Sequence, residues 1–214
     1  MKISVDGSGE IIIKRKSRNN RTKPTSVQSQ VTDRSSANNR LATLVFSKST
    51  IDQMEIRAEG GFRPRMQDVE TAYGMSGDEN IDMLHKFTSN EVIHESTPSA
   101  IYTTTDKKIE YILGERGKTP KTVVDIHTHP AGITELSEED RSTMGKITNV
   151  FREKLPGTKM LFGVHAISEE MALGKRVKPE ASDNSIKWRS LTRVHEVAFY
   201  DEKSRPVDVV IREL

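Results

Sequence analysis

The chain has 214 residues, of which 34% are hydrophobic and 30% charged, a balance that indicates one folded domain with a polar surface and a further polar tail. It contains no cysteine, which excludes disulfides, thiolate nucleophiles and cysteine-ligated zinc, so any metal must be held by histidine and carboxylate groups. No stretch approaches the roughly 18 apolar residues of a membrane helix, and the amino terminus lacks the apolar block of a secretory signal, so we expect a cytoplasmic protein with no membrane partner.

The net charge of +2 conceals a basic amino-terminal segment. Residues 1–13 alternate weakly and end in three isoleucines, which predicts a small ribbon with a turn at 7–9. Residues 14–40 carry eight Lys or Arg against the single Asp33 and few large apolar side chains, so we expect a flexible basic linker. A nucleic-acid-binding arm is the functional alternative, because such charges would neutralise phosphates, but the segment has no aromatic residues.

Residues 41–214 have the composition of a folded domain, and their first half alternates strand and helix patterns. The predicted elements are a strand at 42–47, a helix capped by Ser49 or Thr50 and ending near Ala58, a short strand at 67–77, a turn at 77–80, and a segment at 81–87 whose pattern fits either a strand or a helix.

The second half continues the mixed order of elements. The predicted elements are a helix at 105–114 begun by Thr104 or Thr105, a strand at 122–129, a helix at 137–155, a strand at 159–167, a polar segment at 168–185, and a final strand pair at 194–201 and 206–214 around a turn at 202–205. Helices that feed strands, and strands that feed helices, predict an α/β fold with one mixed central β-sheet flanked by helices.

The run DIHTHPAGITELSEED, residues 125–140, carries the strongest chemical pattern. Alternate residues of a strand face the same side, so His127 and His129 can present two imidazoles to one point. A seven-residue loop leads to Ser137, and it can bring Asp140, on the first turn of the next helix, beside the strand end as a third ligand. Two histidines and one carboxylate leave one zinc position open, which is typical of a hydrolytic site.

A structural explanation exists for each part of this run. Ser137 and Asp140 fit a capping box at a helix start, and an isolated H-x-H on a strand is often incidental. The joint spacing favours a metal site, and both interpretations can hold together, because a ligand on a capped first turn is held rigidly.

The segment His127-Thr128-His129-Pro130, followed by Ser137 and Asp140, resembles the H-[ST]-H-P and S-x-x-D signature of the JAMM (MPN+, Mov34/PAD-1) zinc metalloproteases. The resemblance implies a cytidine-deaminase-like α/β fold over residues 41–214. It also implies one catalytic zinc held by the two histidines and the aspartate, with Ser137 helping to stabilise the oxyanion. An earlier glutamate would act as general base on the zinc-bound water.

Glu70 is the glutamate that best fits this role. Members of the family carry the base in a short strand of the form E-x-x-(small)-x-x-x-G after the first helix, and Gly77 lies seven residues after Glu70. Tyr73 departs from that form, because a small residue is usual there. The alternatives are Glu91, which also fits a capping box with Thr88, and more weakly Glu95 and Glu59.

The resemblance implies an enzyme that hydrolyses peptide or isopeptide bonds, commonly to remove or process ubiquitin-like proteins. A flexible tail of such a substrate would bind as an extended strand along a sheet edge, which makes residues 81–101 a candidate docking surface. Two other hypotheses are a non-catalytic MPN-type scaffold and a nucleic-acid-associated protein that uses residues 14–40. Trp188 is expected to pack against the domain, and surface or core roles with satisfied hydrogen bonds are expected for the histidines without ligand spacing, namely His85, His94, His165 and His195.

Overall fold

The computed structural model describes two compact units of the chain, Met1–Asn38 and Asn39–Leu214. The described residues are 2–5, 11–14, 43–59, 69–87, 92–97, 100–130, 132–169 and 175–212. In the first unit, β1 (Lys2–Val5) and β2 (Ile11–Lys14) form the expected antiparallel ribbon. The turn predicted at 7–9 and the basic linker beyond Lys14 lie outside the described residues.

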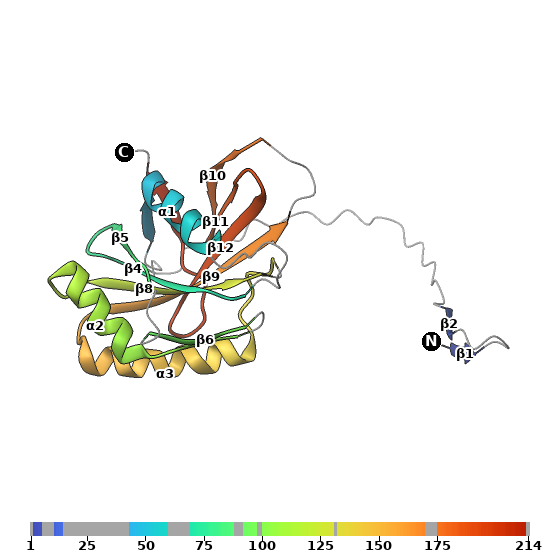
Figure 1. Ribbon diagram of the computed structural model, residues 1–214, viewed down its shortest axis with the longest axis horizontal. Helices are drawn as coiled ribbons and strands as arrows, with labels where there is room; N and C mark the ends of the chain where they lie inside the picture. The colour runs from blue at the N-terminus through green and yellow to red at the C-terminus, as the bar shows by residue number, and fades with distance from the viewer. Residues whose placement is uncertain are drawn as a thin grey trace, which may run out of the picture. The chain divides into compact units, whose positions relative to one another are not determined.

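The second unit is a mixed α/β structure built on a nine-stranded sheet with the order β10-β11-β12-β9-β8-β4-β5-β3-β13 (Figure 1). The pairs β13–β3, β3–β5 and β8–β9 are parallel, and the other neighbours are antiparallel. Its strands are β3 (Leu44–Ser47), β4 (Ala72–Gly77), β5 (Ile81–His85), β8 (Thr122–His129), β9 (Lys159–Glu169), β10 (Val177–Ser182), β11 (Ser185–Arg189), β12 (Arg193–Asp201) and β13 (Val209–Arg212). A separate ribbon pairs β6 (Ile93–Ser96) with β7 (Ile101–Thr103).

The described helices divide between the two faces of the sheet. Helices α2 (Thr105–Arg116) and α3 (Glu138–Lys154) pack side by side on one face, where residues such as Ile112 and Phe151 form one hydrophobic core (Figure 1). Helix α1 (Lys48–Glu59) buries Ile51 and Met54 in a second core on the other face. The mixed α/β fold with a central sheet and flanking helices is therefore confirmed.

The sheet curls around α1, so that elements at its two edges meet. The Val209 N–H of β13 donates to the carbonyl of Asp183, in the turn between β10 and β11, over 2.9 Å. Strand β11 also reaches α1, because the Trp188 Nε1–H donates to Glu55 Oε2 over 2.8 Å. Trp188 therefore packs within the domain, as predicted.

A buried chain of hydrogen bonds crosses the α1 side of the sheet. Tyr73 Oη lies 2.8 Å from His165 Nδ1, His165 Nε2 lies 3.0 Å from His195 Nδ1, and His195 Nε2 lies 3.2 Å from Glu59 Oε1. Burial lowers the pKa of both histidines, which favours neutral rings. Because an ionised carboxylate only accepts, each bond must donate toward Glu59, starting from the Tyr73 hydroxyl.

Two predicted boundaries in the first half were wrong. Helix α1 begins at Lys48 and not after Ser49 or Thr50, because the Ser47 hydroxyl already accepts the Thr50 N–H over 3.2 Å and acts as the cap. Strand β4 begins at Ala72 and not at 67. The ambiguous segment 81–87 forms a strand, β5.

The predictions for the last fifth of the chain were also partly wrong. The predicted polar segment 168–185 contains β10 and the start of β11; β10 escaped detection because an edge strand exposed on both faces has no alternating pattern. The predicted final pair forms a short antiparallel bridge at its turn, between Tyr200 and Pro206, but beyond it β12 pairs with β9 and β11 while β13 pairs in parallel with β3. Turn residues indicate a reversal of the chain, but pairing depends on where the curled sheet offers a free edge.

Gly163 tests the packing between the central strands. A Cβ at this position of β9 would lie 2.8 Å from Ile126 Cγ1, whereas a Cβ at Gly145 in α3 would meet no atom within 4 Å. We expect Gly163→Ala to lower the free energy of unfolding by about 1–3 kcal/mol, because a buried methyl group must displace Ile126. The same change at Gly145 should raise it by about 0.5–1 kcal/mol, because alanine favours helix. Urea denaturation of both variants measures the two values, and equal effects would contradict this account of the packing.

Candidate metal centre

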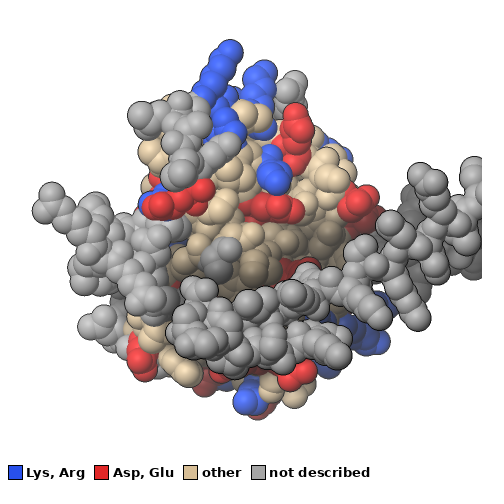
Figure 2. Space-filling view, turned by 90° about the vertical axis from the view of Figure 1, so that its right-hand side faces the viewer, with Lys and Arg blue, Asp and Glu red and all other residues tan. Residues whose placement is uncertain are grey.

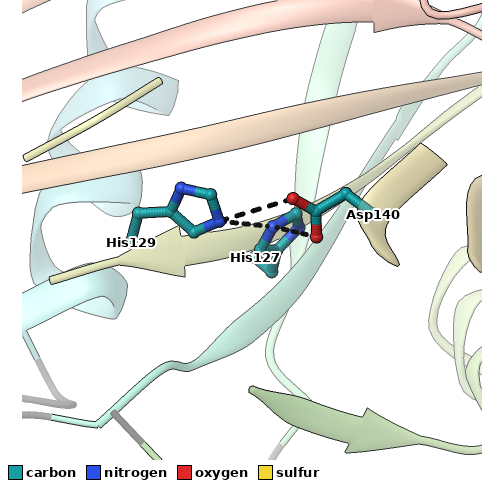
Figure 3. Close-up of side chains that lie close together, drawn as sticks. All are labelled: His127, His129 and Asp140. Atoms are coloured by element: carbon teal, nitrogen blue, oxygen red, sulfur yellow. Dashed lines mark hydrogen bonds and ion pairs between the residues drawn. The ribbon is translucent and has the colours of Figure 1, made fainter. Parts of the chain in front are cut away.

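The candidate metal centre lies where the middle strand of the sheet ends beside a helix start. Strand β8 runs between β4 and β9, and its pleat places His127 and His129 on the same face. Asp140 lies in the first turn of α3. Figure 3 shows the two imidazoles and the carboxylate pointing toward one another. The predicted ligands therefore come together in space.

Two of the three distances between the candidate ligand groups are close to those of a tetrahedral metal site, and the third, from His129 Nε2 to Asp140 Oδ2, is 3.8 Å. His127 Nε2 lies 3.0 Å from His129 Nε2 and 3.2 Å from Asp140 Oδ1, and the three groups offer atoms that all lie within 4.8 Å of one another. Ligands bound to zinc at 2.0–2.1 Å in a tetrahedron lie about 3.3–3.4 Å apart. The side chains of His127 and Asp140 remain 22% and 18% exposed, so the group is open to a further ligand.

Hydrogen bonds to neighbouring groups orient two of the three ligands. His129 Nδ1 lies 2.9 Å from the carbonyl of Ile133, which can only accept, so Nδ1 carries the proton and Nε2 keeps its lone pair. Asp140 Oδ2 accepts from the Ser137 N–H over 2.8 Å and from the Ser137 hydroxyl over 2.7 Å. Its Oδ1 is thereby left facing His127.

The predicted capping box is present, and it coexists with the ligand geometry. The Ser137 hydroxyl also accepts the Asp140 N–H over 3.0 Å, which completes the reciprocal pair at the start of α3. One carboxylate therefore completes the capping box with Oδ2 and faces His127 with Oδ1, while Oδ2 also lies 3.8 Å from His129 Nε2. In this arrangement the Ser137 hydroxyl proton points to Asp140.

The electrostatics favour the protonation states that bind a metal. Partial burial raises the pKa of Asp140, but the bonds and charge from His127 and the bonds from Ser137 outweigh it and hold the pKa well below its ordinary value. Burial, together with the charge of His127, lowers the pKa of His129. An ionised carboxylate and a neutral imidazole are the forms that coordinate metal ions.

Glu70 lies beside this group, just before β4. Ala72 pairs with His127 in the antiparallel ladder, and the Thr71 carbonyl accepts the Thr128 N–H over 2.9 Å, so the pairing extends toward Glu70 and His129. Residues opposite each other in such a ladder project to the same face. Glu70 is buried and lines the same cleft as both histidines.

The surroundings of Glu70 bring its pKa close to neutral pH. Burial raises the pKa of Glu70 to about 7, and the carboxylates of Asp140 and Glu139 act in the same direction against the opposing charge of His127. A pKa near the working pH is what a general base requires. A bound divalent cation would lower this pKa by attraction.

The other glutamates considered from the sequence are placed differently. Glu95 is exposed on β6 and does not line the cleft, and Glu59 bonds to His195 and Ser190 on the α1 side of the sheet. Glu91 lies outside the described residues. Among these candidates that the structure describes, Glu70 alone lines the cleft that contains the candidate metal ligands.

The cleft around the ligands has a volume of about 660 Å³. Its walls come from the start of α3, the end of β8 and the region of β7. Tyr102 of β7 is 51% exposed, and Ile133, in the loop between β8 and α3, is 54% exposed. On the face shown in Figure 2, acidic side chains lie beside a hollow. Sequence reasoning missed the buried pair Lys108 and Asp125, which also lines this cleft. The sequence could have indicated Asp125, because it lies two residues before His127 and therefore on the same face of the strand. The sequence contains no comparable pattern for Lys108.

A second polar cluster has the residue types of a serine hydrolase, but its serine and histidine are not accessible to a substrate. Ser76 Oγ lies 2.8 Å from His85 Nε2, and His85 Nδ1 lies 2.7 Å from Glu115 Oε2. Ser76 and His85 are fully buried, and neither lines the cleft described above. A substrate therefore has no route to this hydroxyl, and His85 has the packing role expected from the sequence.

The comparisons with known proteins assign no family. No family model matches the chain, and no curated protein is significantly similar to it. Among the described residues, no helix is both long and apolar enough to cross a membrane.

Metal binding tests the centre directly. We expect the purified protein to bind about one zinc ion per chain, and His129→Ala to weaken binding at least 100-fold, because a two-ligand site loses most of its affinity. Isothermal titration with zinc and elemental analysis measure both quantities. Glu138→Gln, an acidic neighbour on the same helix turn, serves as control and should bind zinc normally. Equal zinc affinity of His129→Ala and the unchanged protein would contradict the site.

Proposed function

We propose that the protein is a zinc-dependent hydrolase of peptide or isopeptide bonds, with the cytidine-deaminase-like fold of the JAMM metalloproteases. The observation that carries the proposal is the convergence of His127, His129 and Asp140 beside the buried Glu70 in one open cleft. The H-T-H-P and S-x-x-D spacing supports the family assignment. The open side of the ligand group favours catalysis over a scaffold role.

The residues present fit a catalytic zinc, and each has a separate task. When bound, zinc would polarise the scissile carbonyl and acidify water in the cleft. His127, His129 and Asp140 would hold the ion. Glu70 would accept a proton from the attacking water and deliver it to the leaving amine. Rotation of the Ser137 hydroxyl away from Asp140 Oδ2 would let it donate to the developing oxyanion, while the Ser137 N–H keeps the carboxylate in place.

The cleft wall supports an extended peptide as substrate. Four consecutive residues, Ala100–Thr103, line the cleft, and a strand that contributes successive residues presents its backbone edge and not one face. The segment overlaps the carboxyl end of the predicted docking surface, 81–101. We propose that the tail of a ubiquitin-like protein or conjugate pairs with this edge and contacts the exposed Tyr102 and Ile133.

Removal of the proposed base tests the mechanism. We expect Glu70→Gln to lower turnover of a susceptible ubiquitin-like fusion by about 10²–10⁴-fold, because the amide cannot accept the proton. Zinc content should remain unchanged, since Glu70 is not a ligand. Glu95→Gln is the matched control and should keep full activity. Cleavage should also stop with a chelator and return with zinc.

Two outcomes would contradict the proposal. Full activity of the Glu70→Gln variant would exclude Glu70 as the general base. Failure of the zinc-loaded protein to cleave any member of a panel of ubiquitin-like fusions, as followed by mass spectrometry, would remove the substrate class.

A further inference from the structure

A buried ion pair lines the cleft beside the candidate metal centre. Lys108 Nζ of α2 lies 2.8 Å from Asp125 Oδ1 and 2.7 Å from Asp125 Oδ2 on β8. The two side chains are 4% and 9% exposed. The ammonium group also lies 5.6 Å from the centre of the Phe87 ring. Both charged side chains nonetheless border the cleft.

The pair lies on the same face of β8 as the metal ligands. Asp125 precedes His127 by two residues, so the two side chains project to the same side about 7 Å apart along the strand. On β4 their neighbours in the ladder are Gly74 and Ala72. Ala72 lines the cleft beside His127, whereas the Phe87 ring fills the position beside Gly74, where a Cβ would lie 2.7 Å from Phe87 Cζ. An extended peptide spans about 3.3–3.6 Å per residue, so the pair lies about two residues from the metal.

Stability does not explain the pair. The attraction within a buried ion pair offsets little more than the cost of removing both charges from water. Proteins with apolar residues of similar size in its place are often equally stable. The pair does have hydrogen-bonding capacity to spare. Lysine has three ammonium protons, of which Asp125 takes two, and each carboxylate oxygen keeps a second lone pair. Lys108 and Asp125 together therefore offer a donor and an acceptor side by side.

We propose that Lys108 and Asp125 form a subsite that recognises a main-chain amide of the substrate about two residues from the scissile carbonyl. The substrate carbonyl accepts from Lys108, and the substrate N–H donates to Asp125. The inference rests on the proposed zinc-dependent hydrolase, whose cleft it shares. It assigns the pair to substrate positioning and specificity, not to the bond-breaking step.

Hydroxamates of defined length test the subsite without knowledge of the natural substrate. The probes are acetohydroxamic acid, the hydroxamate of N-acetyl-glycyl-glycine, and two analogues of the latter in which either the proximal or the distal amide N–H is replaced by an ester oxygen. The zinc-loaded protein is titrated with each probe by calorimetry. We expect the distal ester to bind about tenfold more weakly than the diamide, because a hydrogen bond to a charged group is lost. The proximal ester should differ less than threefold.

A double variant connects this discrimination to the pair. Lys108→Met with Asp125→Leu removes both charges together and so leaves no unpaired charge in the protein interior. We expect this variant to bind acetohydroxamic acid like the unchanged protein and to distinguish the diamide from the distal ester less than twofold. Zinc content and the thermal unfolding midpoint show that it is folded. The affinities of the two esters are compared on the unchanged protein. This test of the subsite therefore remains valid even if the double variant does not fold.

The possible outcomes distinguish a failure of the proposed subsite from a failure of the proposed hydrolase function. Absence of acetohydroxamic acid binding to the zinc-loaded protein would overturn the proposed function and the subsite with it. Normal binding of this probe, with equal affinities for the diamide and the distal ester, would overturn the subsite alone. Equal losses from the two esters, or a tenfold distinction retained by the double variant, would also overturn it.

Discussion

The carboxylate of Asp140 is the point on which the candidate site depends. Its Oδ2 accepts from the backbone and hydroxyl of Ser137 and so closes the capping box at the start of α3, while Oδ1 lies 3.2 Å from His127 Nε2. The helix dipole favours a negative charge at this end. Because Asp140 completes the capping box and is also the third candidate ligand, the position of α3 fixes the geometry of the candidate metal centre. The capping box and the candidate metal site therefore use the same carboxylate group.

The pleat of the central strands separates a face that borders the cleft from a face that packs against α1. Asp125, His127 and His129 project from β8 toward the cleft, and the first two lie opposite Gly74 and Ala72 of β4. The intervening residues project to the α1 side, where Tyr73 bonds to His165. Tyr73, which departs from the small residue usual in the JAMM pattern, thus fills the packed face and leaves the cleft open. A large side chain is tolerated at position 73 because strand alternation directs it away from the candidate metal ligands.

The hydrogen-bond chain from Tyr73 through His165 and His195 to Glu59 gives the packed face a defined polar layer. Each ring is neutral, and each donor has an acceptor, so the burial of three polar side chains is compensated. The layer joins β4, β9, β12 and α1. Of these strands, β4 and β9 flank β8, which carries the two candidate histidine ligands. Rigid support of this kind suits a site whose ligand atoms must stay within a few tenths of an ångström.

The sequence by itself determined the local features whose cause lies within a few residues. Alternation on residues 122–129 placed the two histidines on one face, and the S-x-x-D pattern at Ser137 gave the capped helix start. Only the tertiary structure decided the features that depend on distant segments. These are the burial that raises the pKa of Glu70, the pairing of β13 with β3 and not with β12, and the meeting of Lys108 with Asp125 across 17 residues of chain. Burial and pairing depend on which surfaces the curled sheet brings together, and no local periodicity encodes that.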